Sequence, residues 1–502
     1  MKYISTRGAI GEIESAAAIA AGIAPDGGLY VPGELPTINL QGIGGLLPLS
    51  YQERAVKILS LFLSDYSYED LVECVTAAYN LEKFDSPAVA PVVTVGNNTH
   101  MLELWHGPTS AFKDMALQLL PHLLSKALTK IGEQAEIVIL VATSGDTGKA
   151  ALDGFKDVER IKVIVFYPEH GVSQIQRLQM VTQQGGNLSV IAVRGNFDDT
   201  QTGVKEIFND PAFNYELLEH DYKLSSANSI NWGRLVPQII YYFSAYCDLV
   251  REQHVSWGQP VNFVVPTGNF GNILAGYYAK LMGLPINRLI CASNSNNVLT
   301  EFINTGTYNR NRPFHKTYSP SMDILISSNL ERLLFHISAA DSAKVQGWME
   351  QLRSTGMYQI EAEYFTKIKE IFFAGYVDDT ETTETIRQVF NDFNYVLDPH
   401  TAVAWRIADN YRLETGDGIP NIIVSTASPF KFNATVLAAL SASKSLSEQA
   451  EFGLLAMLAS LTGWKVPRAL SELEHLKVLH KYTCDKDKMY LAVRDALAGL
   501  KK

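Results

Sequence analysis

The chain is poor in cysteine. Its 502 residues include four cysteines, far apart and without a C-x-x-C pair: Cys74, Cys247, Cys291 and Cys484. This spacing excludes a disulfide framework and a cysteine-rich zinc site, and it predicts a reducing, cytoplasmic location. The eleven histidines show no H-E-x-x-H spacing, so no metal site is expected.

Excess positive charge and long apolar runs are also lacking. Lysine and arginine number 42 against 53 aspartates and glutamates, a net charge of −11. Phosphate backbones need clustered positive side chains, so no nucleic-acid partner is expected. No apolar run approaches the ~18 residues of a membrane span, so no membrane partner is expected either. With 47% hydrophobic residues, the chain is long enough for two or three globular domains.

Apolar segments alternate with helical patterns from about residue 96 onward. The segment Glu136 to Ala142 reads EIVILVA, which is typical of a strand buried on both faces of a parallel sheet. We therefore predict an α/β protein with mainly parallel sheets and a mostly helical N-terminal domain. The expected domains are residues 1–95, a large α/β domain of 96–135 and 229–502 with a helical insertion at 330–395, and a small α/β domain of 136–228.

One lysine has an unusual setting. Lys113 ends the segment His-Gly-Pro-Thr-Ser-Ala-Phe-Lys and lies among small and apolar residues. A desolvated amine of lowered pKa acts as a nucleophile, Schiff-base former or base. Taken alone, the segment favours the alternative, a lysine at a helix start whose stem is packed and whose head is in water.

Parallel sheets bind ligands at the carboxyl ends of their strands, and three loops follow predicted strands. The first, Thr143 to Gly148, is rich in hydroxyls and glycine and opens a helix, so it suits a carboxylate or phosphate. Its glycine spacing is too short for a P-loop. A helix with an ordinary N-cap and a tight turn is the alternative.

The second loop, Gly268 to Asn272, has glycines that let successive N–H groups point at one phosphate. It matches neither a nucleotide P-loop nor a G-x-G-x-x-G turn, so it suits a small phosphate monoester, or is simply a glycine-rich turn. The third loop, Ser425 to Pro429, offers Thr426, whose hydroxyl can meet a neutral ring nitrogen. Together these features predict a pyridoxal-phosphate site: a lysine amine for a Schiff base, a glycine nest for a phosphate, a hydroxyl for a ring nitrogen, and a separate loop for the substrate's carboxylate.

Several segments carry a more specific resemblance, and they occur in a fixed order along almost the whole chain. They are Ala24 to Pro32, His106 to Asp114, Thr143 to Gly148, Gly195 to Asp199, Ser229 to Trp232, Pro266 to Asn272, Ser319 to Phe335 and Asp398 to Thr401. In these segments the chain resembles the long form of the threonine synthase family. The resemblance implies pyridoxal-phosphate fold type II, the tryptophan-synthase-β-like fold, with the cofactor between two α/β domains.

The resemblance also implies residue roles. Lys113 lies where the family's lysine forms the Schiff base with the cofactor. The cofactor phosphate would be held by Gly268, Asn269, Phe270, Gly271 and Asn272. Thr426 would face the pyridine nitrogen. Asp146 lies where many relatives place an asparagine near the cofactor's phenolic oxygen. A carboxylate is disfavoured there unless it is protonated or turned away, so the role of Asp146 stays open. The substrate carboxylate would meet Thr143, Ser144, Gly145 and Thr147.

The implied reaction converts O-phospho-L-homoserine and water to L-threonine and phosphate in a monomer or homodimer. The leaving phosphate needs cations or donors, and the candidates are Ser173, Arg177, Asn228, Lys149 and Arg234. Two alternatives stay open. One is a pyridoxal-phosphate lyase or dehydratase for a related phosphorylated or hydroxy amino acid. The other is a threonine-synthase-like protein without turnover.

Overall fold

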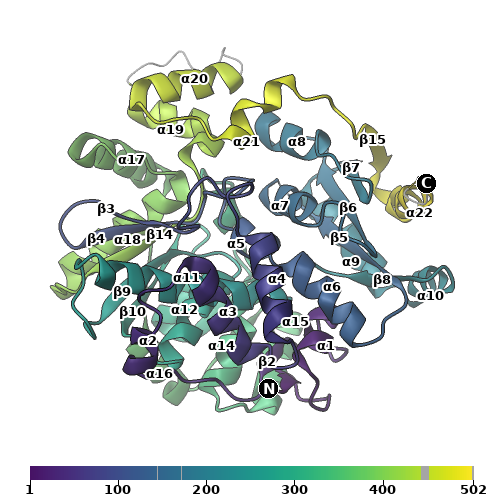
Figure 1. Ribbon diagram of the computed structural model, residues 1–502, viewed down its shortest axis with the longest axis horizontal. Coiled ribbons are helices and arrows are strands. Elements are labelled where there is room, and N and C mark those ends of the chain that lie inside the picture. Colours follow the sequence, from purple (N-terminus) through teal and green to yellow (C-terminus); the bar gives the residue numbers. More distant parts are fainter. Residues whose placement is uncertain (144, 171, 442–450, 500–502) are drawn as a thin grey trace.

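The computed structural model describes residues 1–143, 145–170, 172–441 and 451–499. Two separate sheets form its framework, the larger at the left and the smaller at the right of Figure 1. The prediction of an α/β fold with mainly parallel sheets is confirmed. No helix in the described ranges is long and apolar enough to cross a membrane.

The N-terminal region is mostly helical, as predicted. Its α3 and α4 each begin with a capping box, in which Ser50 pairs with Glu53 and Ser67 with Asp70. Its only paired strands in the described part are antiparallel to each other. The elements are β1 (Tyr3–Ser5), α1 (Ser15–Ala21), β2 (Tyr30–Pro32), α2 (Leu40–Gly44), α3 (Tyr51–Phe62) and α4 (Tyr68–Ala78).

The larger sheet has the order β13-β10-β9-β14-β4-β3, and every neighbouring pair is parallel except β3 with β4. Its strands are β3 (Val92–Thr94), β4 (Thr99–Glu103), β9 (Val261–Pro266), β10 (Ile286–Ser293), β13 (Phe372–Tyr376) and β14 (Asn421–Ser425). Helices connect them: α5 (Asp114–Leu117), α6 (Leu120–Lys130), α11 (Trp232–Arg251), α12 (Gly271–Leu281), α13 (Val298–Thr305) and α18 (Pro399–Thr415). All residues of β9 are buried, which explains why every position except Asn262 is apolar.

The smaller sheet is entirely parallel, with the order β15-β7-β6-β5-β8. Its strands are β5 (Glu136–Ala142), β6 (Ile161–Pro168), β7 (Leu188–Arg194), β8 (Tyr222–Ser225) and β15 (Tyr482–Asp485). Its helices are α7 (Asp146–Gly154), α8 (Gln174–Val181), α9 (Phe197–Asn209), α10 (Pro211–Glu219) and α22 (Met489–Gly499). One apolar core lies between this sheet, α9, α10 and α22.

Two expected domain assignments need correction. The C-terminal tail was expected on the larger domain, but β15 pairs with β7 and α22 packs on the smaller sheet (Figure 1). Residues 330–395 were expected to be a helical insertion, but β13 within them is an edge strand of the larger sheet. In both cases a short strand gains its hydrogen bonds from a distant partner, which local periodicity does not reveal.

Most of the remaining elements lie around the larger sheet, whereas the two short helices at 473–475 and 486–488 contact helices of the smaller sheet. Between β10 and β14 the chain forms β11 (Thr307–Asn309), η1 (Pro320–Met322), α14 (Leu330–Ile337), α15 (Ser342–Thr355), β12 (Met357–Gln359), α16 (Ala362–Ile371) and α17 (Asp379–Phe393). After β14 come η2 (Pro429–Phe432), α19 (Asn433–Leu440), α20 (Glu451–Thr462), α21 (Arg468–Ser471), η3 (Leu473–His475) and η4 (Lys486–Lys488). The carboxyl ends of β4, β5, β9 and β14 lead into the segments that the sequence singled out.

Candidate active site

The loop from β4 to α5 places Lys113 beside the end of β14. The backbone N–H of Phe112 donates to the carbonyl oxygen of Thr426 at 2.8 Å, and Ala111 forms a bridge with Ala427. The lysine side chain is 13% exposed, so its amine lies in the interior with a narrow opening. The structure thus brings the lysine and the third loop together.

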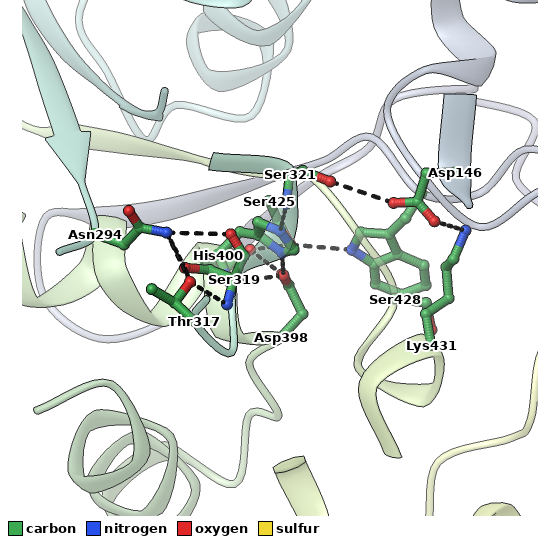
Figure 2. A network of polar contacts seen from close by, with 12 residues as sticks. Asp146, Asn294, Thr317, Ser319, Ser321, Asp398, His400, Ser425, Ser428 and Lys431 are labelled. Atoms are coloured by element: carbon green, nitrogen blue, oxygen red, sulfur yellow. Dashed lines mark hydrogen bonds and ion pairs between the residues drawn. The ribbon is translucent and has the colours of Figure 1, made fainter. Parts of the chain in front are cut away.

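Asp146 joins the first loop to Lys113. Its Oδ2 lies 3.7 Å from the Lys113 Nζ, and its Oδ1 lies 2.8 Å from the Nζ of Lys431, a completely buried lysine on η2. Figure 2 shows the carboxylate between the Lys431 amine and the hydroxyl of Ser321. Burial by itself would raise the pKa of the Asp146 carboxyl, but attraction to Lys431 and Lys113 outweighs burial and holds the pKa well below its usual range. Asp146 is therefore an anion turned toward two amines, not a protonated acid.

The amine of Lys113 is poised for chemistry. Burial lowers the pKa of its ammonium form below the ordinary value, because a desolvated charge is costly. Asp146 opposes this effect, while the positive charges of Lys431 and Arg234 add to it. A lysine with a lowered pKa reaches the neutral, nucleophilic form more readily than a surface lysine does.

The loop between β9 and α12 forms a cradle for an anion. Phe270 has a φ of 61°, and the N–H groups of the first turn of α12 follow it without intrahelical partners. A Cβ at Gly268 would lie 2.6 Å from the carbonyl oxygen of Ser321, so only glycine fits there. Ser321 also accepts a 3.3 Å hydrogen bond from the Lys113 Nζ at its hydroxyl, which places this loop next to the lysine.

Asn272 shows that this cradle suits a phosphate. Its side-chain oxygen accepts hydrogen bonds from the hydroxyls of Tyr241 at 2.7 Å and Tyr242 at 2.9 Å, which fixes the amide's orientation. Its Nδ2 is buried and has no partner among the described residues. A buried donor without a partner costs about 1–3 kcal/mol, and an anion at the start of α12 would satisfy it.

The first loop is held by its own threonine. The Thr143 hydroxyl oxygen accepts from the N–H groups of Gly145 at 2.9 Å and Gly148 at 3.0 Å, which closes the turn before α7. Thr147 is partly buried in the first turn of that helix. Ser144, the remaining predicted member, lies outside the described residues.

Only some of the residues predicted for a substrate phosphate are suitably placed. Arg177 and Asn228 are exposed, and Ser173 caps α8 by accepting from the N–H of Gln176. The first turn of α8 is already occupied, because the N–H of Ile175 donates to the carboxylate of Glu451 at 2.9 Å. The amine of Lys149 is also already paired, because it forms an ion pair with Asp153 and donates a hydrogen bond to the side-chain oxygen of Gln183.

Arg234 is a second buried cation whose charge acts on Lys113. Its residue is 4% exposed, its guanidinium donates to the carbonyl of Ala227, and its Nε has no partner among the described residues. Burial lowers the pKa of Arg234 to about 10, so the group stays charged at neutral pH. A buried positive charge with a spare donor near Lys113 suits an anionic ligand.

Three residues of the site were missed in the sequence. Lys431 lies in Pro-Phe-Lys-Phe directly after the third loop, and the criterion that selected Lys113, a lysine in an apolar setting, would have selected it too. The hydroxyl of Ser321 contacts Lys113 and Asp146. His400 Nε2 accepts from the backbone N–H of Ser321 at 3.1 Å, and its Nδ1 lies 2.8 Å from Asp398 (Figure 2). The imidazole therefore carries its proton on Nδ1 and holds Ser321 in place.

Family models match most of the chain. A model described as "Threonine synthase N terminus" matches residues 2–79, one described as "Pyridoxal-phosphate dependent enzyme" matches residues 94–426, and one described as "Threonine synthase, C-terminal" matches residues 401–476. The middle model spans Lys113, the first two loops and Thr426.

Individual relatives agree with these models. Threonine synthase-like 1 from Homo sapiens is 44% identical over 84% of this chain, but the match covers 57% of that relative's length, so this chain spans little more than half of it. Threonine synthase from Pseudomonas aeruginosa is 40% identical, over 87% of this chain and 90% of the relative. The crystal structure of pyridoxal-phosphate-bound threonine synthase from Brucella melitensis has a TM-score of 0.87 and 38% identity, and covers 99% of both chains.

Proposed function

Because this chain belongs to the threonine synthase family, we propose that it converts O-phospho-L-homoserine and water to L-threonine and phosphate. Pyridoxal phosphate is the cofactor. The convergence of three loops at Lys113 carries the proposal. Asp146 from the first loop and Ser321 beside the second contact its amine, and Thr426 of the third accepts a hydrogen bond from the backbone N–H of the preceding Phe112. This convergence supplies an amine, an anion cradle and a ring contact at one place.

In this proposal Lys113 holds the cofactor's aldehyde carbon, and the α12 N-terminus with Asn272 holds its phosphate. Thr426 faces the ring nitrogen with a neutral hydroxyl. Bound pyridoxal phosphate supplies an electron sink for negative charge at the substrate's Cα. The ring nitrogen stays less protonated opposite a threonine than opposite a carboxylate, which moderates that sink.

Lys113 then moves protons. Once the substrate's amino group has displaced it, the amine accepts the Cα proton as a general base. Its lowered pKa favours this role near neutral pH, because a base must be unprotonated to act. A Cβ proton leaves next, and phosphate departs from Cγ. A proton returned to Cγ then forms the methyl group, and water adds its hydroxyl at Cβ and releases its other proton. Returning a proton to Cα completes threonine.

Two anionic groups of the substrate need separate sites. We assign the carboxylate to the turn of Thr143, Gly145 and Thr147, where the start of α7 offers N–H groups. We assign the leaving phosphate to Arg234, because it is a buried cation with a spare donor. The exposed Arg177 and Asn228, and Ser173, remain second candidates that would have to move to contact it.

We also propose a location and an assembly state. All four cysteines are buried and free, which fits a reducing cytoplasm. We propose a monomer or a homodimer, which analytical ultracentrifugation would distinguish.

A coupled assay tests the activity. The purified protein is given O-phospho-L-homoserine, and phosphate and threonine are both measured. Equal amounts are expected, together with loss of both in Lys113→Ala and retention in Lys156→Ala, an exposed lysine after α7. Phosphate released with a 2-keto acid would identify a lyase instead. A bound cofactor without turnover would favour the non-catalytic alternative.

A further inference from the structure

Lys431 is a completely buried lysine that contacts the Lys113–Asp146 pair. Its side chain is 0% exposed, and its Nζ makes two contacts: 2.8 Å to Asp146 Oδ1 and 2.9 Å to the carbonyl oxygen of Thr109. Thr109 belongs to the same loop as Lys113. One amine thus ties the first loop to the lysine loop.

The pair with Lys431 is the tighter of the two that Asp146 makes. Lys431 lies 2.8 Å from one carboxylate oxygen, whereas Lys113 lies 3.7 Å from the other. A buried carboxylate needs a permanent counter-charge, because an uncompensated buried ion is strongly destabilising. Lys113 is not permanent in this sense, since its nitrogen must lose its proton to react.

We propose that Lys431 is a positioning residue that acts through Asp146. It is the fixed counter-charge of this carboxylate, and it thereby leaves the nitrogen of Lys113 free to be uncharged and reactive. The inference rests on the proposed use of Lys113 to hold pyridoxal phosphate. It explains why an aspartate is tolerated beside the cofactor: the carboxylate is neutralised by a lysine from outside the three loops.

Other charged and polar groups surround the Lys113 nitrogen and the Asp146 carboxylate. Arg234 of α11 adds positive charge, Ser321 of η1 accepts its hydrogen bond, and His400 of α18 lies close enough to act on Asp146. The test variants at Lys431 and Asp146 leave Arg234, Ser321 and His400 unchanged. Changes in the Lys113 nitrogen therefore report the Asp146–Lys431 pair.

Opposite shifts in two single variants form the test. The absorbance of bound pyridoxal phosphate is titrated with pH in the holoenzyme, and its midpoint reports protonation at the nitrogen that joins Lys113 to the cofactor. Lys431→Met removes a repelling positive charge, so the midpoint should rise by about one unit. Asp146→Asn removes an attracting negative charge, so the midpoint should fall by about one unit. The double variant should lie near wild type, and so should Lys431→Arg, which keeps the charge.

A residue with a merely structural role would not produce this pattern. Shifts of both single variants in the same direction, an unchanged midpoint in Lys431→Met, or Lys431→Arg behaving like Lys431→Met would each overturn the inference. If circular dichroism shows that Lys431→Met is unfolded, Asp146→Asn and Lys431→Arg decide the question by the same criteria.

The outcome is separable from that of the proposed activity. Absence of cofactor absorbance in the wild type would refute the proposed function and this inference together. A wild type that shows the expected titrations but forms no threonine would refute the activity alone and support the role of Lys431.

Discussion

Asp114, the residue after Lys113, should make the protein less stable as pH rises, and Asp114→Asn should remove this dependence. The carboxyl group is 0% exposed, and its oxygens accept hydrogen bonds from the backbone N–H of Thr109 at 2.8 Å and the Thr109 hydroxyl at 2.7 Å. Burial raises the pKa of Asp114 from 3.8 to about 7, against these hydrogen bonds, which favour the carboxylate. A protonated Asp114 keeps both contacts by donating to the hydroxyl.

The direction and size follow from linkage. The pKa is higher in the folded state than in the unfolded chain, so the folded state retains a proton that the unfolded state has released. Stability is therefore highest below the unfolded pKa and falls as pH rises through the window between about 4 and 7. A rise of about three units corresponds to about 4 kcal/mol in total, of which about 2 kcal/mol is lost between about pH 5 and pH 7. An asparagine cannot ionise and loses nothing over this range.

Urea unfolding at about pH 5 and pH 7 provides the measurement. The free energy of unfolding of Asp114→Asn relative to wild type should increase by about 2 kcal/mol between the two pH values. Asp198→Asn, at an exposed aspartate of α9, is the matched control, because it removes no buried charge. A difference between Asp114→Asn and wild type that stays constant, or shrinks toward pH 7, would show that Asp114 is not the strained acid that the structure describes.

Three further outcomes follow from the site. Lys113→Ala should reduce turnover at least about 1000-fold. It should also abolish covalent cofactor attachment, which is measured by mass spectrometry after borohydride reduction. An unchanged circular dichroism spectrum would show that the fold persists. Gly268→Ala should weaken pyridoxal-phosphate binding at least about tenfold in equilibrium dialysis, because its Cβ would lie 2.6 Å from the Ser321 carbonyl; unchanged affinity would contradict the assigned cradle. Arg234→Met should raise KM for O-phospho-L-homoserine at least about tenfold, with little change in cofactor binding, if it meets the substrate phosphate. An unchanged KM would move that role to Arg177 or Asn228.

Local sequence patterns predicted the parts that neighbouring residues dictate. The apolar run of β5 was recognisable as a strand, because a strand covered on both faces needs apolar residues at nearly every position. The glycines of the second loop indicated the cradle, because a positive φ or a close backbone approach leaves a trace in the residue type. Lys113 was recognisable because a lysine among small and apolar neighbours is uncommon.

Long-range contacts were not predictable in the same way. The short strands β13 and β15 have little signal of their own, and they are strands because β10 and β7 offer free edges. Likewise, 285 positions separate Lys431 from Asp146, so no spacing rule joins them. Glu451 of α20 is a similar case. Its carboxylate accepts a hydrogen bond from the N–H of Ile175 in the first turn of α8, where Ser173 was a candidate for binding the substrate phosphate.

The sequence by itself thus determined the α/β class, the reactive lysine and the three loops at strand ends, because each depends on residues close together in the chain. Only the tertiary structure decided which charges face one another: that Asp146 lies between two lysines, that Ser321 and His400 complete the lysine's surroundings, and that Arg234 is the buried cation with a donor to spare. These properties depend on distance and burial, and in this fold the chain topology sets both.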